Sequence, residues 1–350
     1  MNQNTKKRIG YIDAIRGFAM ILVVYFHISA YGFGSYVTGY NDILEWFRMP
    51  LFFFISGLLF NEKKWISNPR QQIWQKFMAL IVPTTIFMLL YLILFGYFDF
   101  SSFGSDKKGY WFTFVLFEFF VIYIGFKKLF DRHNTTTGEV LVMIAILALS
   151  ITAFYYAMYY TRYAEDLGLW KTFLGLFSFV KIRHIIFFWF GLFVRRHFER
   201  FVLLTNKPYT IIVMIVLFIA MIINPCISSV SGLEYMAYFM AGVISIIVIF
   251  TIFRKLSVVH SSFFHLPSAI LKYIGKHTLD IYLIHYFVLP YHIEWIANNL
   301  NLYENSFLCM LISLILTIFI IAISLCISKL IRKSSFLTSY LLGEKARDIK

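Results

Sequence analysis

The sequence predicts an all-α integral membrane protein with about ten transmembrane helices and both termini in the cytoplasm. Three observations predict this class. Of the 350 residues, 60% are hydrophobic and 14% are charged, whereas a soluble domain carries about 25% charged residues. Apolar segments of about 20 residues, which suffice to cross a hydrocarbon core of about 30 Å, recur along the whole chain. The basic residues cluster in the short segments between them, as topology signals do.

The apolar segments define the domain organisation. We place them at 12–33, 43–61, 77–98, 111–130, 140–160, 173–194, 208–226, 233–253, 270–291 and 306–330. No soluble domain, linker or low-complexity tract interrupts them, so residues 1–350 are expected to form a single membrane domain. The first segment follows a basic tail, as a signal peptide does. It contains ionisable residues and lacks a small-residue cleavage site, so we predict that it is retained as a span.

The distribution of Lys and Arg predicts the orientation. With ten spans, 25 of these residues fall in loops or membrane edges on the side of the termini, and 4 fall on the opposite side. This asymmetry places the termini in the cytoplasm. The net charge of +14 would also suit a nucleic-acid-binding protein, but its division into short clusters between apolar segments argues against that class.

Arg16 and His27 are the most informative pair in the first segment. They are eleven positions apart, which in a helix is about three turns and about 16 Å, so both side chains lie on one face. Ionisable side chains are costly against lipid and almost always face a protein interior or a water-filled cavity. The pair therefore predicts a polar path into the membrane along this helix.

Four more predicted spans carry ionisable residues at a depth similar to that of His27, in the half opposite the termini. These residues are Arg48, Glu118, Lys181, Arg183, His184, Asp280 and His285, with Tyr282 beside the last two. Convergence of five helices favours a lined cavity. Structural alternatives remain for several of these residues: an interhelical hydrogen bond for His27, His285 and Tyr282, snorkelling for Arg48, and snorkelling or ion pairing for Lys181 and Arg183.

Two stretches carry a resemblance to a known family. IDAIRGFAMILVVYFH, with Asp13, Arg16 and His27, resembles the first span of the acyltransferase-3 family of membrane acyltransferases, and RMPLFFFISG, from Arg48 to Gly57, is similar to its second-span pattern. WFTFVLFEFF and IGKHTLDIYLIH are similar to weaker family stretches. The resemblance covers essentially the whole chain. The small pair Ser56-Gly57 is expected to make a close helix contact, not to supply a nucleophile.

The resemblance implies an O-acyltransferase of the stand-alone form in a bacterial plasma membrane. It would move an acyl group, most often acetyl, from cytoplasmic acetyl-CoA or another short acyl-CoA to a hydroxyl of an extracytoplasmic or lipid-linked polysaccharide. No metal is expected. The sequence leaves open which acyl group and which glycan are used, and the oligomeric state.

The chemistry of such a transfer suggests roles for the candidate residues. A sugar hydroxyl needs a base during attack on a thioester, and the histidine pKa lies close to working pH, so His27 is the expected general base. A transient acyl-histidine stays open as an alternative. Arg16, oriented by Asp13, is expected to bind the CoA phosphates. We further expect Arg48 and Glu118 to take part in catalysis and Lys76 to bind the donor. The residues expected to bind the substrate are Arg183, His184, Tyr282 and His285.

Two other classes fit many spans with a charged interior. A transporter or flippase for a glycan precursor is disfavoured because the sequence shows no clear internal repeat or paired broken helices. A non-catalytic scaffold of a glycan-synthesis complex is the other class, and its function should survive replacement of His27. Transport would continue without acyl-CoA, whereas acyl transfer would not.

Overall fold

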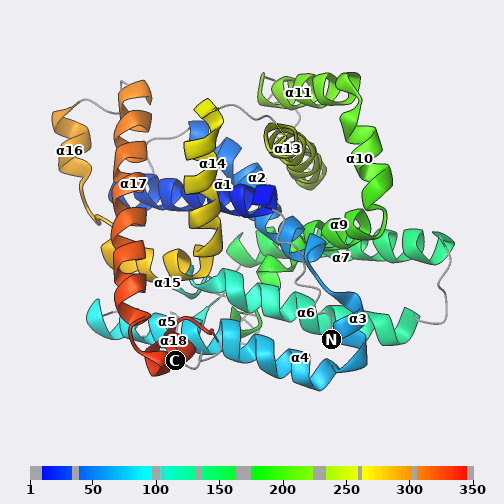
Figure 1. The fold of residues 1–350 in the computed structure, drawn as a ribbon, viewed down its shortest axis with the longest axis horizontal. Helices are drawn as coiled ribbons and strands as arrows, with labels where there is room; N and C mark the ends of the chain where they lie inside the picture. The colour runs from blue at the N-terminus through cyan, green and yellow to red at the C-terminus, as the bar shows by residue number, and fades with distance from the viewer. Residues whose placement is uncertain are drawn as a thin grey trace. The chain divides into compact units, whose positions relative to one another are not determined.

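A computed structural model describes residues 10–33, 39–96, 103–104, 106–130, 136–162, 175–223, 234–258, 262–300 and 306–344. Every regular element in these residues is a helix, which confirms the predicted all-α class (Figure 1). The ends of the predicted spans at 97–98, 173–174, 224–226 and 233, and the basic tail at 6–8, lie outside the described residues.

The described part of each predicted span falls mainly on a helix or on consecutive helices. Within the described residues, five helical segments are long and apolar enough to cross a membrane: Gly10–Gly32, Pro69–Leu94, Gly138–Ala157, Tyr235–Leu256 and Phe307–Ile331. A sixth is obtained if Phe198–Asn206 and Pro208–Ile222, which meet at an angle of 82°, form one broken span. The chain is therefore a multi-pass membrane protein, and ten crossings with cytoplasmic termini remain a prediction.

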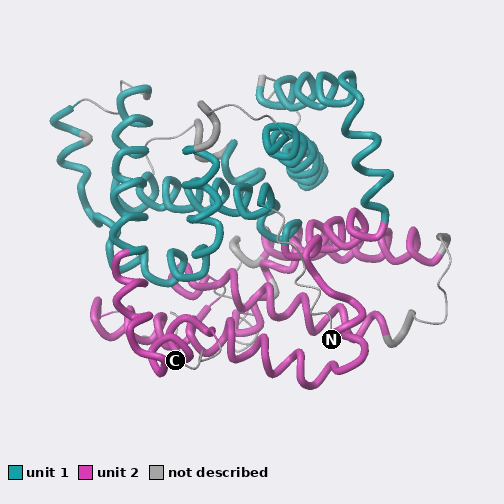
Figure 2. Tube along the Cα trace, in the orientation of Figure 1, with its two compact units in different colours: residues 1–55, 197–325 teal, residues 56–196, 326–350 magenta. Residues whose placement is uncertain are grey.

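The chain folds into two compact units. The first comprises residues 1–55 and 197–325, and the second comprises residues 56–196 and 326–350 (Figure 2). Two of the three boundaries fall inside helices, α2 (Gly39–Leu58) and α17 (Ser306–Ile331), and the third falls directly after Arg196. Each unit is built from helices that are far apart in the sequence.

The first unit is built around α1 (Gly10–His27), which continues into the π-helical turn η1 (Ile28–Gly32). Its other helices are α10 (Phe198–Asn206), α11 (Pro208–Ile223), α13 (Glu234–Leu256), α14 (Ser262–Lys276), α15 (Thr278–Val288) and α16 (Glu294–Asn299), with the first parts of α2 and α17. Fully buried Phe250 on α13 joins several of them, since its ring contacts those of Tyr11, Phe54 and Phe201.

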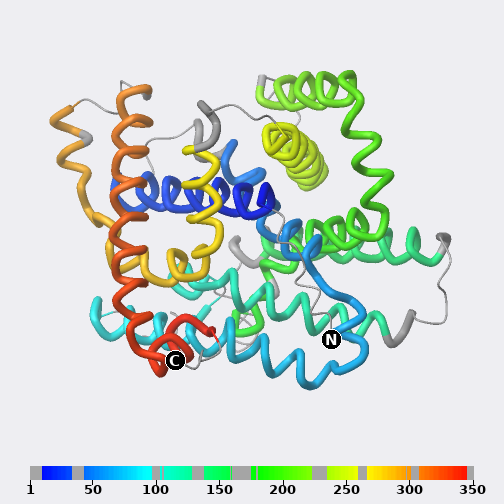
Figure 3. Tube along the Cα trace, viewed as in Figure 1, coloured from blue at the N-terminus to red at the C-terminus, as the bar shows by residue number. Residues whose placement is uncertain are grey.

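The helices α1 and α14 cross in close backbone contact, as the N-terminal and yellow segments of Figure 3 show. Gly17 on α1 faces the backbone of Leu271, and Gly275 on α14 faces the carbonyl oxygen of Asp13. A Cβ atom at either glycine would collide with these backbone atoms. Small residues thus allow an approach that no larger side chain permits, as is typical of membrane helix pairs.

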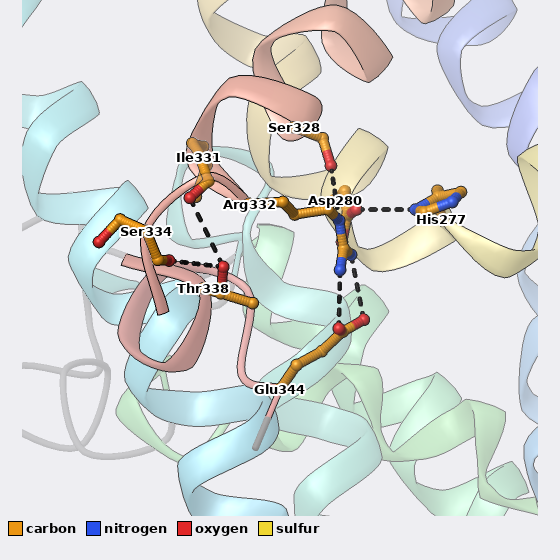
Figure 4. A network of polar contacts seen from close by, with 8 residues as sticks. All are labelled: His277, Asp280, Ser328, Ile331, Arg332, Ser334, Thr338 and Glu344. Carbon is orange, nitrogen blue, oxygen red and sulfur yellow. Dashed lines mark hydrogen bonds and ion pairs between the residues drawn. The ribbon is translucent and has the colours of Figure 1, made fainter. Parts of the chain in front are cut away.

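The predicted span 270–291 is wrong as a single helix. The chain breaks at His277, whose backbone is not helical (φ −111°, ψ 22°), and restarts as α15 in a different direction (Figure 1). The Nδ1 atom of His277 lies 3.0 Å from a carboxylate oxygen of buried Asp280 in the first turn of α15 (Figure 4). An acidic side chain near a helix N-terminus is favourable, so Asp280 stabilises the start of α15. The contact with His277 holds its carboxylate in that place.

The second unit contains the end of α2, α3 (Glu62–Ser67), α4 (Pro69–Lys76), η2 (Phe77–Ile81), α5 (Val82–Leu94), η4 (Lys107–Gly109), α6 (Trp111–Phe130), α7 (Thr136–Arg162), η5 (Phe179–His184), α9 (Ile185–Arg196), the end of α17 and α18 (Ser335–Leu341). Its core is aromatic: the ring of Phe60 lies 4.7–5.7 Å from those of Trp65, Phe120, Tyr123 and Phe188. Gly57 lies against the backbone of Phe188, which confirms the close contact predicted for it.

The predicted helix 173–194 is also wrong in its first half. Gly175 and Leu176 are helical, but Ser178 adopts a left-handed backbone (φ 49°) and Phe179–His184 is a 3₁₀-helix, so regular α-helix resumes only at Ile185. Tertiary contacts stabilise this irregular segment. The ammonium of buried Lys107 donates hydrogen bonds to the Gly175 carbonyl (2.9 Å) and the Ser178 hydroxyl (2.8 Å), and Lys181 pairs with Asp106 at 2.6 Å.

A polar network joins α3, α6, α7 and α9. The Arg196 guanidinium donates to both oxygens of Glu62 (2.9 and 2.7 Å) and to Glu139 (3.0 Å), and the Tyr123 hydroxyl donates to Glu62 at 2.7 Å. Burial alone would raise the pKa of Glu62, but the hydrogen bonds from Arg196 and Tyr123 outweigh it and hold the pKa below its ordinary value. The network therefore favours the ionised carboxylate.

We expect Glu62→Gln to lower stability at neutral pH by about 1–2 kcal/mol, since Arg196 is partly exposed to solvent. A carboxylate whose folded pKa is depressed stabilises the protein above its unfolded pKa and loses that contribution as pH falls through the folded pKa. The difference between wild type and variant should therefore shrink as pH is lowered below about 4.5. Thermal unfolding in detergent from pH 7 to pH 3.5 measures it. Glu199→Gln, at an exposed carboxylate on α10, is the control and should show no such trend.

The C-terminal segment of the second unit is tied by Arg332. Its guanidinium donates to both carboxylate oxygens of Glu344 (2.7 and 3.0 Å) and to the Ser328 hydroxyl (Figure 4). The short helix α18 packs against α5, and Gly343, with φ 65°, lies against the backbone of Ala79. This end of the chain is therefore an integral part of its unit.

Candidate functional site

The first unit brings two histidines into direct contact. His27 ends α1, and its Nδ1 atom lies 2.9 Å from Nε2 of His285 on α15. The rings are stacked, with centroids 5.1 Å apart. His285 is fully buried, whereas His27 is only partly buried. His285 is thus the more deeply buried member of the pair.

The hydrogen bonds define which nitrogen of His27 carries the lone pair. A carbonyl oxygen only accepts, so Nδ1 of His285 must donate its hydrogen to the Ile281 carbonyl, 2.9 Å away. In a neutral imidazole the other nitrogen is an acceptor, so Nε2 of His285 accepts from Nδ1 of His27. His27 therefore presents its lone pair at Nε2, where the Tyr286 hydroxyl lies 3.4 Å away. This arrangement is that of a base oriented by a second group.

Tyrosines surround the pair. The Tyr286 ring centroid lies 5.0 Å from that of His27 and 4.1 Å from that of His285. Tyr31, in the turn after α1, lies 5.6 Å from His27 and is exposed. Tyr282, a predicted substrate residue, packs beside His285 at 6.3 Å and is buried. These rings restrict the rotation of both imidazoles.

Arg48 belongs to the same environment. Its guanidinium lies 3.3 Å from the centre of the Phe26 ring, one residue before His27, and its charge acts on His27. The side chain is 8% exposed, and Nε has no acceptor within hydrogen-bonding distance among the described residues. A buried donor without an acceptor is costly, so it is a candidate for binding an anionic or carbonyl oxygen.

Arg16 lies about three turns before His27 on α1. One guanidinium nitrogen donates to the Thr278 hydroxyl at 2.7 Å, and another lies 3.9 Å from a carboxylate oxygen of buried Asp13. Thr278 is the first residue of α15, so the break at His277 places the start of a helix next to Arg16. Helix starts and arginines both favour anions.

The other predicted site residues belong to the second unit. Lys76 ends α4, with its ammonium 5.5 Å from the centre of the Phe120 ring. The Arg183 guanidinium lies 5.7 Å from the centre of the Phe154 ring. Buried His184 stacks on Trp111 at 5.6 Å. These ring contacts position Arg183 and His184, and a substrate role for either residue stays a prediction.

Glu118 has a cationic neighbour in its own unit. Its carboxylate acts on Lys107, and Oε2 is buried without a hydrogen-bond donor among the described residues. Burial lowers the pKa of Lys107 to about 8, and the charges of Glu118 and Asp106 offset part of that effect. Lys107 and Lys108 have left-handed backbones (φ 44° and 49°). Sequence reasoning had assigned no role to Lys107.

Two residues at the first-unit site were not predicted. Thr278 and Tyr286 are a common polar and a common aromatic residue of an apolar helix, so the sequence around them gives no sign of a functional role. Their place beside predicted Asp280 and His285 is the only hint in the sequence. In the described residues, no group of three or more His, Cys, Asp or Glu side chains has the arrangement of a metal site.

Comparison with known proteins gives one match. A family model described as an acyltransferase domain matches residues 9–330, nearly the whole chain. No curated protein and no solved structure matches it.

Proposed function

Since the chain belongs to the acyltransferase-3 family by its match over residues 9–330, we propose that it moves an acyl group, most simply acetyl, from cytoplasmic acyl-CoA to a hydroxyl of an extracytoplasmic or lipid-linked glycan. The observation that carries this proposal is the hydrogen-bonded pair of His27 and His285, with the lone pair of His27 at Nε2. Acyltransferase activity follows from the family. The donor, the acceptor and the histidine base are our proposal.

The reaction is one acyl transfer with balanced proton movement. The acceptor hydroxyl loses its proton to Nε2 of His27 as its oxygen attacks the thioester carbonyl. The tetrahedral oxyanion collapses, the carbon–sulfur bond breaks, and the thiolate of CoA takes the proton back from His27. Arg48 supports this scheme with a buried, unsatisfied N–H that would stabilise the oxyanion. Glu118 is a further catalytic candidate whose role the scheme does not need.

His285 acts in this scheme as a positioning residue, which revises the substrate role predicted for it. Its Nδ1 is committed to the Ile281 carbonyl and its Nε2 to His27, so no ring nitrogen is left for a substrate. It holds His27 in the tautomer that a base needs. Tyr282, Arg183 and His184 stay candidates for the acceptor side.

Arg16 is assigned to the phosphates of the donor, with Asp13 and Thr278 orienting its guanidinium. Arg16 and His27 are about 16 Å apart along α1. This distance suits an acyl-CoA whose phosphates contact Arg16 while its thioester lies beside His27. Lys76 is a second donor candidate.

We expect Arg16→Ala to raise the KM for acyl-CoA at least about tenfold, the loss of one charge-assisted contact, with a smaller effect on kcat. Initial rates over a range of acyl-CoA concentrations measure it. Arg200→Ala, at an exposed arginine on α10, is the matched control and should leave KM unchanged. An equal rise in both variants would indicate a general effect of basic surface charge.

The structure also corrects one argument against a transporter. The sequence shows no broken helices, yet the chain breaks at His277 and bends by 82° between α10 and α11. Broken helices are common in transporters, so a glycan-precursor transporter or flippase is the second candidate.

One experiment separates the two functions. Inverted membrane vesicles from a deletion strain, with or without the restored protein, receive acetyl-CoA labelled in the acetyl group, and their glycans are analysed by NMR. Labelled esters that depend on the protein support the transferase. Glycan translocation that continues without acyl-CoA, with no labelled ester formed, would instead establish transport and refute our proposal.

A further inference from the structure

The second unit contains an open groove whose lining includes none of the residues assigned to acyl transfer. It lies among α6, α7 and α9 and holds about 650 Å³ of empty space, a figure that includes the open solvent at its mouth. Charged side chains line one part of it, and aliphatic and aromatic side chains line the rest. A groove of this composition suits an amphipathic ligand.

The charged part of the groove is balanced. Lys127, Glu139 and Arg196 line it, and Glu62 joins them through its two hydrogen bonds with Arg196. Two cationic and two anionic side chains give no net charge. CoA carries several phosphate charges, and this groove would leave most of them uncompensated. A headgroup that carries one positive and one negative charge is complementary to it.

The apolar part of the groove continues onto a surface suited to lipid. Val142, Met143 and Leu192 line it, together with Phe193, which is 39% exposed. Ile144, on the same helix as Val142, is 57% exposed. Both residues lie in Gly138–Ala157, a segment that is long and apolar enough to cross a membrane. An acyl chain lying in the groove would therefore be continuous with the bilayer around α7.

The wall of the groove also contains an unsatisfied donor. Trp189 is 6% exposed, and its indole N–H has no acceptor within hydrogen-bonding distance among the described residues. A buried donor without a partner costs about 1–3 kcal/mol. The ester carbonyls of a glycerolipid are acceptors of the kind that this group lacks.

We propose that this groove binds one zwitterionic glycerophospholipid, with its phosphate beside Lys127, its ammonium beside Glu139 and an acyl chain along Val142, Met143 and Leu192. The lipid would fill the space between α6, α7 and α9 and tie the unit to the bilayer. This inference does not depend on acyl transfer, because it concerns a groove that the proposed reaction does not use.

Native mass spectrometry of the protein in nanodiscs of equal phosphatidylethanolamine and phosphatidylglycerol tests the proposal. Val142→Trp fills the groove, and Ile144→Trp places the same side chain on the exposed face of the same helix as the matched control. We expect wild type and Ile144→Trp to retain one phosphatidylethanolamine. Occupancy should fall at least about tenfold in Val142→Trp.

Lys127→Gln provides a second test that does not alter packing. It should lower phosphatidylethanolamine occupancy while the protein elutes as wild type in gel filtration, and it decides the question if Val142→Trp does not fold. Equal retention by Val142→Trp and Ile144→Trp would show that only surrounding bilayer lipid is carried along. Displacement of the lipid by acyl-CoA, one molecule for one, would make the groove a donor site. Either result would overturn the proposal.

Discussion

Replacing His27 with alanine is expected to reduce acyl transfer by about 10²–10⁴-fold, which is the usual contribution of a positioned general base. The expected loss is in kcat, because in the proposed scheme Nε2 of His27 acts on the acceptor proton during bond formation and Arg16 still holds the donor. Label transfer from acetyl-CoA to glycan in membranes with matched protein levels measures the effect. Trapping of label on His27 in the presence of donor alone would show an acyl-histidine intermediate in place of direct transfer.

His292→Ala is the matched control for this prediction. His292 lies in the same unit, its side chain is 82% exposed and it pairs with Glu294, so its loss should leave the rate unchanged. His285→Ala should lower the rate by about 10–100-fold, as removal of a group that orients a histidine does, and should also alter the pH profile. A wild-type rate and ester content with His27→Ala would refute the histidine base and favour the scaffold or transporter.

Replacing Gly275 with leucine is expected to prevent stable folding of the first unit. Its Cβ would overlap the carbonyl oxygen of Asp13, a backbone atom that cannot move unless α1 and α14 separate. Overpacking a core costs about 1–3 kcal/mol where side chains can shift, and here none can. The melting temperature and the yield of monodisperse protein in detergent measure the loss. Gly17→Leu should act similarly, because it faces the backbone of Leu271.

Gly125→Ala is the control for the glycine prediction. Among the described residues, no atom apart from the neighbouring backbone of its own helix lies within 4 Å of a Cβ at Gly125 on α6. Alanine is favoured over glycine in a helix by about 1 kcal/mol. This variant should be as stable as wild type or more stable. A wild-type melting temperature in Gly275→Leu would contradict the close crossing of α1 and α14.

The sequence alone determined the membrane class and the helical fold, because hydrophobicity and helix length act locally. It also placed Arg16 and His27 on one face of the first helix, since helix periodicity extends over the eleven positions that separate them. The irregular segments were missed for the opposite reason. Helical propensity around Lys181 and His277 is overridden by contacts with Asp106 and Asp280.

Only the tertiary structure decided the partners of these two residues. His27 meets His285 across 258 positions, and Arg16 meets Thr278 across 262. No local pattern encodes such pairings. They arise because Gly17 and Gly275 let α1 and α14 approach closely, and because the break at His277 turns α15 so that its residues contact both ends of the path along α1. The sequence thus supplied a candidate base and a candidate anion site, and packing decided which residues contact each of them.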